Sequence, residues 1–126
     1  MVHKFLDKHS DSFYFVFRVI VGIVFLLHGI MKVKFWMAGQ LPVGSLMFFA
    51  MIIEVIGGVL IILGLFTRYT ACVAAIEMIV AYTTVHLASG KGINPLANGG
   101  EAAVLFFAIF LVLAAFGARK WAIDKK

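Results

Sequence analysis

Long apolar stretches alternate with short polar segments along the chain, and this pattern sets the predicted architecture. Four stretches are nearly free of charged residues, and they cover residues 13–31, 46–66, 69–88 and 102–118. Each is close to the ~20 residues that an α-helix needs to cross ~30 Å of hydrocarbon. Because the bilayer core offers the backbone no water to bond, runs of this length predict helices. The pattern therefore predicts an all-α fold, a single domain over residues 1–126 built as a four-helix transmembrane bundle.

The connections and their charges predict how the bundle is oriented. The second and third runs meet at residues 64–68, which predicts an antiparallel hairpin with a tight turn. Four spans place both termini and this turn on one side of the membrane. That side holds Lys4, Lys8, Arg68, Arg119, Lys120, Lys125 and Lys126, and the other side holds Lys32, Lys34 and Lys91. By the positive-inside rule, we expect a multi-pass protein of the cell (plasma) membrane with both termini in the cytoplasm.

Composition supports the membrane assignment and excludes several other classes. Hydrophobic residues make up 63% of the 126 residues and charged residues 13%, with a mean hydropathy of +1.07. This is more apolar surface than one small soluble core hides. The net charge of +5 includes no basic run, so no nucleic-acid partner is expected. The single cysteine, Cys72, excludes an internal disulfide and any CxxC redox or zinc motif.

Three ionisable residues lie inside the predicted spans: Arg18, Glu54 and Glu77. A charge at the centre of a membrane helix costs about 2.5 to 3.5 kcal/mol, so each needs a partner or a wet cavity. At about 100° per residue, Glu54 shares one helical stripe with the glycines that follow it, which are Gly57, Gly58 and Gly64. We expect this stripe to be a helix-packing seam, with an intramembrane ion pair between Arg18 and Glu54. The alternative is that the pair serves only to fix helix register.

Further polar residues lie near the outer ends of the predicted helices and are candidates for one polar pocket. They are His28, Lys32, His86, Asn98 and Glu101. In the alternative interpretation, Lys32 extends to the head groups and His28 caps a helix end. Asn98 can also cap the last helix, with Glu101 three positions further on as in a capping box. Glu77 and His86 are nine positions apart, on opposite faces of an ideal helix, and the direction of Glu77 stays open.

Cofactor chemistry has only weak signals in the sequence. His28 and His86 are conceivable haem ligands, and together with Glu101 they are a conceivable metal site. Neither arrangement has a diagnostic spacing, so haem or a metal is not expected. No serine or cysteine has a nearby base, and no catalytic residue is assigned.

The order of these motifs resembles the DoxX family of small membrane proteins. The resemblance lies in R-x9-HG-x2-K from Arg18 to Lys32, E-x2-GG-x5-G-x2-TR from Glu54 to Arg68, and N-x2-E before the last helix. It covers residues 18–124. It implies a four-helix membrane bundle within a group described as candidate oxidoreductases. Its relatives include the quinone-linked membrane subunit of thiosulfate oxidation and members of complexes with oxidant-detoxifying partners. By position, the family's polar signature falls on Arg18, His28, Lys32, Glu54, Arg68 and Glu101.

Two functional hypotheses follow. The first is a membrane subunit of a quinone-linked oxidoreductase or of an oxidative or thiol-stress complex, with a quinone between the helices and electrons from a soluble redox partner protein. A neutral quinone suits an apolar slot with a few polar groups. The alternative is a small-molecule carrier or a non-catalytic membrane scaffold for a soluble enzyme. Because four short helices form a thin bundle, we also expect a homo-oligomer.

Overall fold

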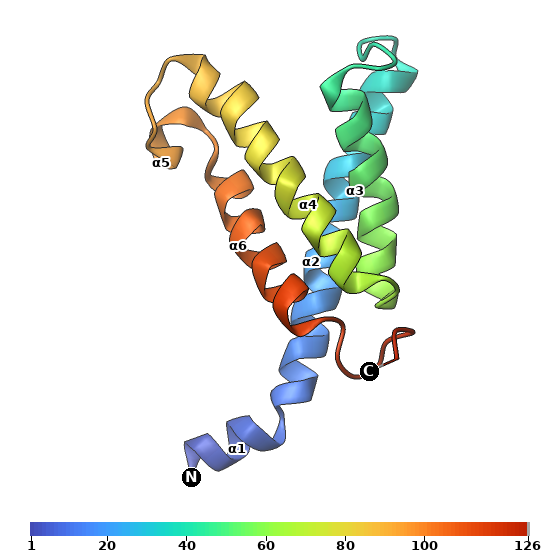
Figure 1. Cartoon of the computed structure of the whole chain (residues 1–126), viewed down its shortest axis with the longest axis vertical. Helices are drawn as coiled ribbons and strands as arrows, with labels where there is room; N and C mark the ends of the chain where they lie inside the picture. The colour runs from blue at the N-terminus through green and yellow to red at the C-terminus, as the bar shows by residue number, and fades with distance from the viewer. Residues whose placement is uncertain (126) are drawn as a thin grey trace.

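The computed structural model describes residues 1–125 and shows a helical bundle with both ends of the chain at the same end of the molecule (Figure 1). We call this the terminal end, and the opposite one the loop end. The elements in chain order are α1 (Val2–Lys8), α2 (Ser10–Met37), α3 (Leu46–Leu63), α4 (Thr67–Ala81), the π-helical turn η1 (Tyr82–His86), the 3₁₀ turn η2 (Leu87–Ser89), α5 (Pro95–Asn98) and α6 (Glu101–Phe116). Residues 1–125 contain no strand, so the predicted all-α class is confirmed.

Three helical stretches are long and apolar enough to cross a membrane, namely α2, α3 and the continuous stretch Thr67–Ser89. The helix α6 is also apolar but has only 16 residues. Helix α2 extends the first predicted run, 13–31, at both ends and stops shortly before Gly39 and Pro42. The second predicted run stops early at Leu63, because Gly64 takes a left-handed conformation with φ 67° that ends α3. The tight hairpin predicted at residues 64–68 is confirmed.

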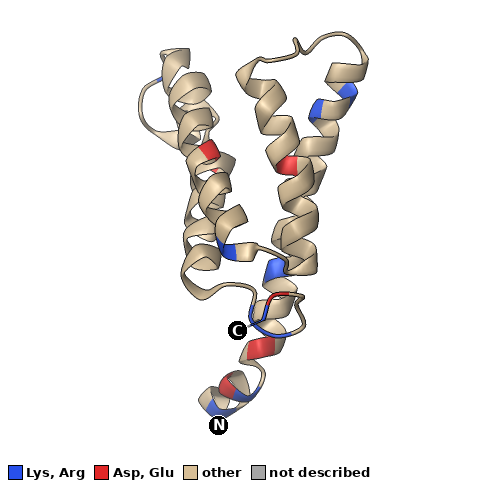
Figure 2. Cartoon of the chain, turned by 45° about the vertical axis from the view of Figure 1, so that its right-hand side comes forward, with Lys and Arg blue, Asp and Glu red and all other residues tan. Residues whose placement is uncertain are grey.

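The helices pack as two pairs that separate toward the loop end. Helix α2 packs mainly on α3 and α4 mainly on α6, while α3 and α4 meet over a shorter length (Figure 1). The fully buried side chains Phe25, Ile61, Phe110 and Leu113 form the centre of the core. Charged positions gather around the terminal end and are sparse along the middle of the helices (Figure 2). The two helix pairs are therefore closest together at the terminal end.

Glycines allow close contact between α2 and α3. A Cβ atom added to Gly58 would lie 2.7 Å from both the Cβ and the backbone nitrogen of Leu26. One added to Gly22 would lie 2.9 Å from the backbone nitrogen of Ile62. Gly57, next to Gly58, faces the ends of the Phe25 and Thr70 side chains, 3.3 Å from a Cβ. The three glycines of the predicted seam thus have different surroundings, since Gly64 ends α3 and lies against Ala122.

Arg18 has no exposed surface and donates all its hydrogen bonds to backbone carbonyls. Its Nε donates to Ile61 (3.1 Å) and its terminal nitrogens donate to Ala118 (2.6 Å), Lys120 (3.1 Å), Ile62 (3.5 Å) and Trp121 (2.7 Å). The predicted ion pair between Arg18 and Glu54 is therefore wrong. Glu54 lies seven residues before Ile61 on α3, about 10 Å away along the helix axis. The unpaired carbonyls at the end of α3 are nearer partners for the guanidinium.

The C-terminal tail, residues 117–125, crosses the α3–α4 turn and closes it. The backbone nitrogen of Ile123 donates to Leu63 O (3.1 Å) and that of Asp124 donates to Gly64 O (2.8 Å). The Asp124 carboxylate accepts from the backbone nitrogens of Phe66 (2.7 Å) and Thr67 (2.9 Å). Asp124 thereby caps the start of α4, where unpaired N–H groups and the helix dipole favour an anion.

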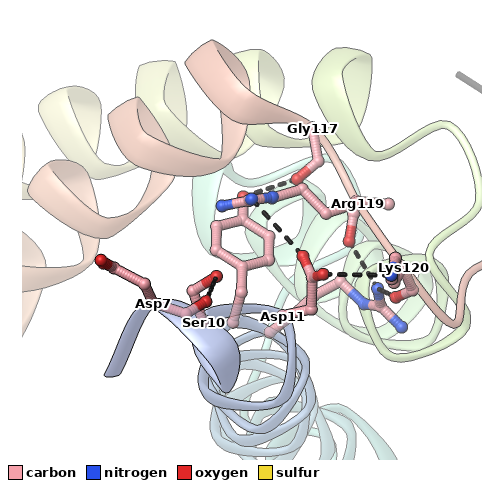
Figure 3. A network of polar contacts seen from close by, with 9 residues as sticks. Asp7, Ser10, Asp11, Gly117, Arg119 and Lys120 are labelled. Atoms are coloured by element: carbon pink, nitrogen blue, oxygen red, sulfur yellow. Dashed lines mark hydrogen bonds and ion pairs between the residues drawn. The ribbon is translucent and has the colours of Figure 1, made fainter. Parts of the chain in front are cut away.

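A second set of contacts joins the same tail to the start of α2 (Figure 3). The Tyr14 hydroxyl donates to Gly117 O at 2.6 Å. Asp11 lies 3.4 Å from Arg119 and 3.3 Å from Lys120, as ion pairs that are partly open to solvent. Exposed pairs of this kind contribute little, so the buried bonds of Arg18 and the cap by Asp124 hold the tail more strongly.

The α2–α3 contact predicts different changes in stability when two adjacent glycines are substituted. Gly58→Ala places a methyl group against the backbone of Leu26 and should lower the free energy of unfolding by about 1 to 3 kcal/mol. Gly57→Ala meets only movable side-chain ends and gains helix propensity, so its change should stay within about 1 kcal/mol. Denaturant titration in detergent micelles, followed by circular dichroism, measures both. Equal effects of the two substitutions contradict the close contact.

The Asp124 cap predicts a pH-dependent contribution to stability. Burial raises the pKa of Asp124, but the N–H groups of Thr67 and Phe66 and the charge of Arg18 bring this pKa below its ordinary value of 3.8. Stabilisation from a lowered pKa is fully present above the ordinary value and disappears as the pH falls through the lowered one. Asp124→Ala should cost about 1 kcal/mol at neutral pH, and its difference from wild type should shrink in acid.

The matched control for Asp124→Ala is Asp7→Ala, on the exposed helix α1. Unfolding curves of the three proteins between neutral and acid pH decide the question. A deficit of Asp124→Ala that stays constant over the whole range shows that the carboxylate charge has no part in the cap.

Candidate functional site

A buried ion pair joins α2 to α3 in the half of the bundle nearer the loop end. Lys32 Nζ lies 2.9 and 2.7 Å from the two carboxylate oxygens of Glu54. The side chains of Lys32 and Glu54 are 19% and 6% exposed. Lys32 therefore turns into the bundle. This differs from the alternative interpretation, in which Lys32 extends to the lipid head groups.

Glu77 of α4 lies beside this pair. It is 8% exposed, and neither of its carboxylate oxygens has a hydrogen-bond partner among the described residues. Glu77 lines the same pocket as Lys32 and Glu54. The sequence left the direction of Glu77 open, and the structure turns it inward. Three charged groups from three helices thus meet where α3 and α4 separate.

These three groups form the polar part of an apolar pocket of about 320 Å³ between α3 and α4. We call it the lateral pocket. Its lining residues are Lys32, Leu46, Met47, Phe49, Ala50, Ile53, Glu54, Val73, Ile76, Glu77, Val80, Ala81, Thr84 and Val85. Several of its walls lie on the outer surface of the bundle, including Phe49 at 53% and Ile76 at 62% exposure. The pocket therefore opens sideways, toward the lipid that surrounds a membrane protein.

A second apolar hollow continues the groove along α3 and α4 toward the terminal end. It has a volume of about 290 Å³, reaches Tyr69, and shares Ile53 and Val73 with the lateral pocket. Together the two hollows form an elongated apolar groove that ends at the buried charges. Such a shape suits a molecule with a compact polar head and a long apolar chain.

A smaller cavity, of about 130 Å³, lies on the other side of Glu54. We call it the inner cavity. It is lined by Phe25, His28, Glu54, Met78, Ala81, His86, Ala102, Ala103 and Phe106. The His28 ring packs edge-on against Phe106, with 5.6 Å between the ring centroids. Glu54 and Ala81 belong to the walls of both spaces, so Glu54 is the polar residue between the inner cavity and the lateral pocket.

The loop end is organised by Asn98, which is buried at 6% exposure. Its Nδ2 donates to the Tyr82 hydroxyl (3.2 Å) and to Gly92 O (3.0 Å), and its Oδ1 accepts from Gly100 N (2.8 Å). The expectation that Asn98 caps the last helix is wrong, because α6 starts after Gly100 without a side-chain cap. Asn98 instead holds the loop against η1, and its backbone oxygen lies 3.3 Å from His86 Nδ1.

The structure brings together only part of the polar pocket predicted from the sequence. His28 and His86 line the inner cavity, Lys32 lines the lateral pocket, and Asn98 lies behind His86. Glu101 is exposed and lines neither space. The sequence interpretation missed the pairing of Lys32 with Glu54 and the inward position of Glu77. The signal for Glu77 was its isolation in an apolar run, where an unpaired acid is costly.

The arrangement can hold and transfer protons and can bond a polar head group. Lys32 is a donor, the carboxyl groups of Glu54 and Glu77 accept when ionised and donate when protonated, and a neutral imidazole has one nitrogen that donates and one that accepts. Within residues 1–125, no group of three or more His, Cys, Asp or Glu side chains is placed to hold a metal ion.

The apolar helices, the lateral opening and the buried charges define a small helical membrane protein. The sequence matches the family model for DoxX over residues 13–87. An "Uncharacterized protein" of Haemophilus influenzae (strain ATCC 51907 / DSM 11121 / KW20 / Rd) is 40% identical over 128 residues, which cover 96% of this chain and 95% of that protein. The "Putative oxidoreductase CatD" of Bacillus subtilis (strain 168) is 33% identical over 127 residues, covering 94% and 90%. No solved structure matches. The chain belongs to the DoxX family, and the resemblance found in its motifs is confirmed.

The buried pair predicts that Lys32 is required for stability. Lys32→Met leaves Glu54 without its counter-charge and should cost about 3 kcal/mol, in the range found when one partner of a buried pair is removed. Lys34→Met, two positions further on an exposed part of the same helix, should cost less than about 0.5 kcal/mol. Unfolding in detergent measures both.

The double variant Lys32→Met/Glu54→Gln completes the test of the pair. Because the glutamine carries no charge, the double variant should be more stable than Lys32→Met alone. Additive losses from the two substitutions contradict a direct interaction between Lys32 and Glu54.

Proposed function

We propose that this protein is the membrane subunit of a quinone-linked oxidoreductase, with the quinone ring in the lateral pocket. The supporting observation is the pocket itself, because an apolar space of about 320 Å³ ends at Lys32, Glu54 and the unpartnered Glu77. Ligand sites of this kind are mostly apolar with a few convergent polar groups. The "Putative oxidoreductase" among the relatives agrees with redox chemistry.

The residues present fit a quinone. Lys32 Nζ has a third N–H bond beyond the two that it directs to Glu54, and it can bond a carbonyl oxygen. Glu77 lines the same pocket, and its buried carboxyl oxygens have no hydrogen-bond partner among the described residues. The adjoining hollow toward Tyr69 offers an apolar path for an isoprenoid chain. When bound, a quinone accepts two electrons and two protons and leaves as a quinol.

The chain's own residues have three tasks in this proposal. Lys32 orients the carbonyl group and stabilises negative charge that develops on its oxygen. Glu77 holds a proton at its carboxyl oxygen, next to the head group. The apolar walls, including Phe49 and Ile53, exclude bulk water from the pocket.

We also propose the membrane arrangement. Helix α6 is the fourth span, because its 16 residues extend about 24 Å and pack on α4, which begins the membrane-length stretch Thr67–Ser89. The terminal end lies in the cytoplasm and the protein in the plasma membrane, as the basic residues near both termini and the α3–α4 turn favour. The lateral pocket then lies in the outer half of the bilayer.

Electrons must come from another protein in this proposal. Because a lone cysteine forms no dithiol within one chain, we propose a soluble partner that carries a two-electron redox group, and a homo-oligomer as the membrane unit. The terminal end offers that partner a basic surface with Arg68, Arg119 and Lys125.

Quinone binding is tested on the protein purified from its native membrane in mild detergent. We expect near-stoichiometric quinone in the organic extract by mass spectrometry, well above that of an unrelated membrane protein. Ala50→Phe fills the lateral pocket and should lower bound quinone about tenfold, equivalent to about 1.4 kcal/mol. Ala115→Phe, on the exposed surface of α6, is the matched control and should bind as wild type.

Background quinone in the wild type overturns the redox proposal. The carrier or scaffold alternative then takes its place, and two measurements separate these. Uptake of a lipophilic compound that Ala50→Phe blocks supports a carrier. A stable complex with a soluble enzyme and an empty extract supports a scaffold.

A further inference from the structure

We propose that Glu54 and Glu77 share a proton and relay it from the inner cavity, lined by His28 and His86, to a ligand in the lateral pocket. The inference deepens the proposed function in that the ligand there is a quinone. The relay itself is a property of the side chains and is measurable without any quinone.

The charge balance of the lateral pocket is the first observation. Two buried carboxyl groups and one lysine line the lateral pocket, and both short contacts of Lys32 go to Glu54. Glu77 is only 8% exposed, and none of the described residues bonds its carboxylate oxygens. A buried carboxylate without a counter-charge is expensive in hydrocarbon. One proton on the pair removes this charge and gives Glu77 an O–H donor toward its neighbour.

The position of Glu54 is the second observation. Its carboxylate is fixed by Lys32, and it lines both the lateral pocket and the inner cavity. A carboxyl group with two oxygens can accept a proton on one side and release one on the other. Glu54 is therefore placed to connect two spaces that the helices otherwise keep apart.

The inner cavity supplies the path toward the loop end. Its volume of about 130 Å³ has room for several waters, since one water needs about 10 to 15 Å³ of such space and a few polar partners. His28 and His86 provide those partners together with Glu54. His86 is half-buried at the loop end, where its Nδ1 lies near Asn98 O. It can thus exchange protons with water outside the bundle.

The π-helical turn η1 contributes to this geometry. On an uninterrupted α-helix, Glu77 and His86 point in opposite directions. The wider turn at residues 82–86 changes the helical phase before His86. His86 is thereby turned part of the way back toward the side of Glu77, although the two residues still line different spaces on either side of Glu54.

Each transfer is balanced in bonds and charge. The O–H bond of Glu77 breaks as an O–H bond forms on the ligand oxygen. The electrons that reduce the ligand come from the two-electron carrier of the soluble partner. Glu77 then takes a proton from Glu54, and Glu54 takes one from the imidazolium of His28 or His86. Water at the loop end returns that proton. Two such cycles supply both protons of a quinol.

The relay is tested by infrared spectroscopy on the full chain in phosphatidylcholine vesicles, with no quinone added. We expect the wild type to show the carbonyl absorption of a protonated carboxyl group at neutral pH. Glu77→Gln and Glu54→Gln should each abolish or shift it. Glu101→Gln, whose residue is exposed and outside both spaces, is the matched control and should leave it unchanged.

Hydrogen exchange gives a second readout. If the carboxyl pair has only a structural role, substitution of the histidines should leave the exchange rate unchanged. After transfer to D₂O, the carboxyl absorption shifts as the proton exchanges. His86→Gln and the double variant His28→Gln/His86→Gln should slow this shift severalfold, while circular dichroism shows that the helices are intact.

The outcomes separate the relay from the proposed function. An absorption that survives both glutamate substitutions, or none in the wild type, overturns the relay. Exchange that is unchanged in the double histidine variant overturns the path through the inner cavity. If the relay tests succeed but quinone extraction gives background values, only the quinone assignment fails.

Discussion

The lack of water in the bilayer core is the constraint on which the rest of the structure depends. Each buried polar group must find its partner within the protein. Arg18 meets this requirement by donating to five backbone carbonyls, and Lys32 meets it through Glu54. Among the described residues, the exceptions are the Thr67 hydroxyl and the carboxyl oxygens of Glu77, and of these only Glu77 is an acid. An unsatisfied acid that the fold nevertheless keeps buried is more readily explained by chemistry than by stability.

The two ends of the bundle meet this constraint in different ways. At the terminal end, the tail, the α3–α4 turn and the start of α2 are bonded together around Arg18. Toward the loop end the helix pairs separate, and the space between them contains the lateral pocket. A rigid base with diverging helices keeps a cavity open without large loops, which a chain of 126 residues does not have.

Apolar run length and turn residues predicted most of the fold, because both act locally. The hairpin at residues 64–68 and the helical class follow directly from them. Partner choice could not be predicted, because it depends on depth along neighbouring helices. Arg18 and Glu54 are the most conspicuous opposite charges in the sequence, yet they lie at different heights of the bundle, and Lys32 is the residue at the height of Glu54.

The candidate site shows the same division between local and non-local signals. His28, Lys32 and His86 were predicted to lie near one another, and they line neighbouring spaces on either side of Glu54. The inward turn of Glu77 and the phase change at η1 were not predictable, because helical arithmetic assumes a regular repeat. Glu101 satisfied the pattern but lies outside both spaces. Position near a helix end therefore did not predict whether a residue lines a cavity.

The closure of the α3–α4 turn by the tail has a consequence for how the protein is made. During synthesis the ribosome completes α3 and α4 long before residues 117–125 emerge. The carbonyl partners that Ala118, Lys120 and Trp121 provide for Arg18 are therefore missing until residues 117–125 have been synthesised. Until then, the charged guanidinium of Arg18 has only part of its hydrogen bonds. Synthesis of residues 117–125 is thus the event that fixes the base of the bundle, and assembly of the site above it follows that event.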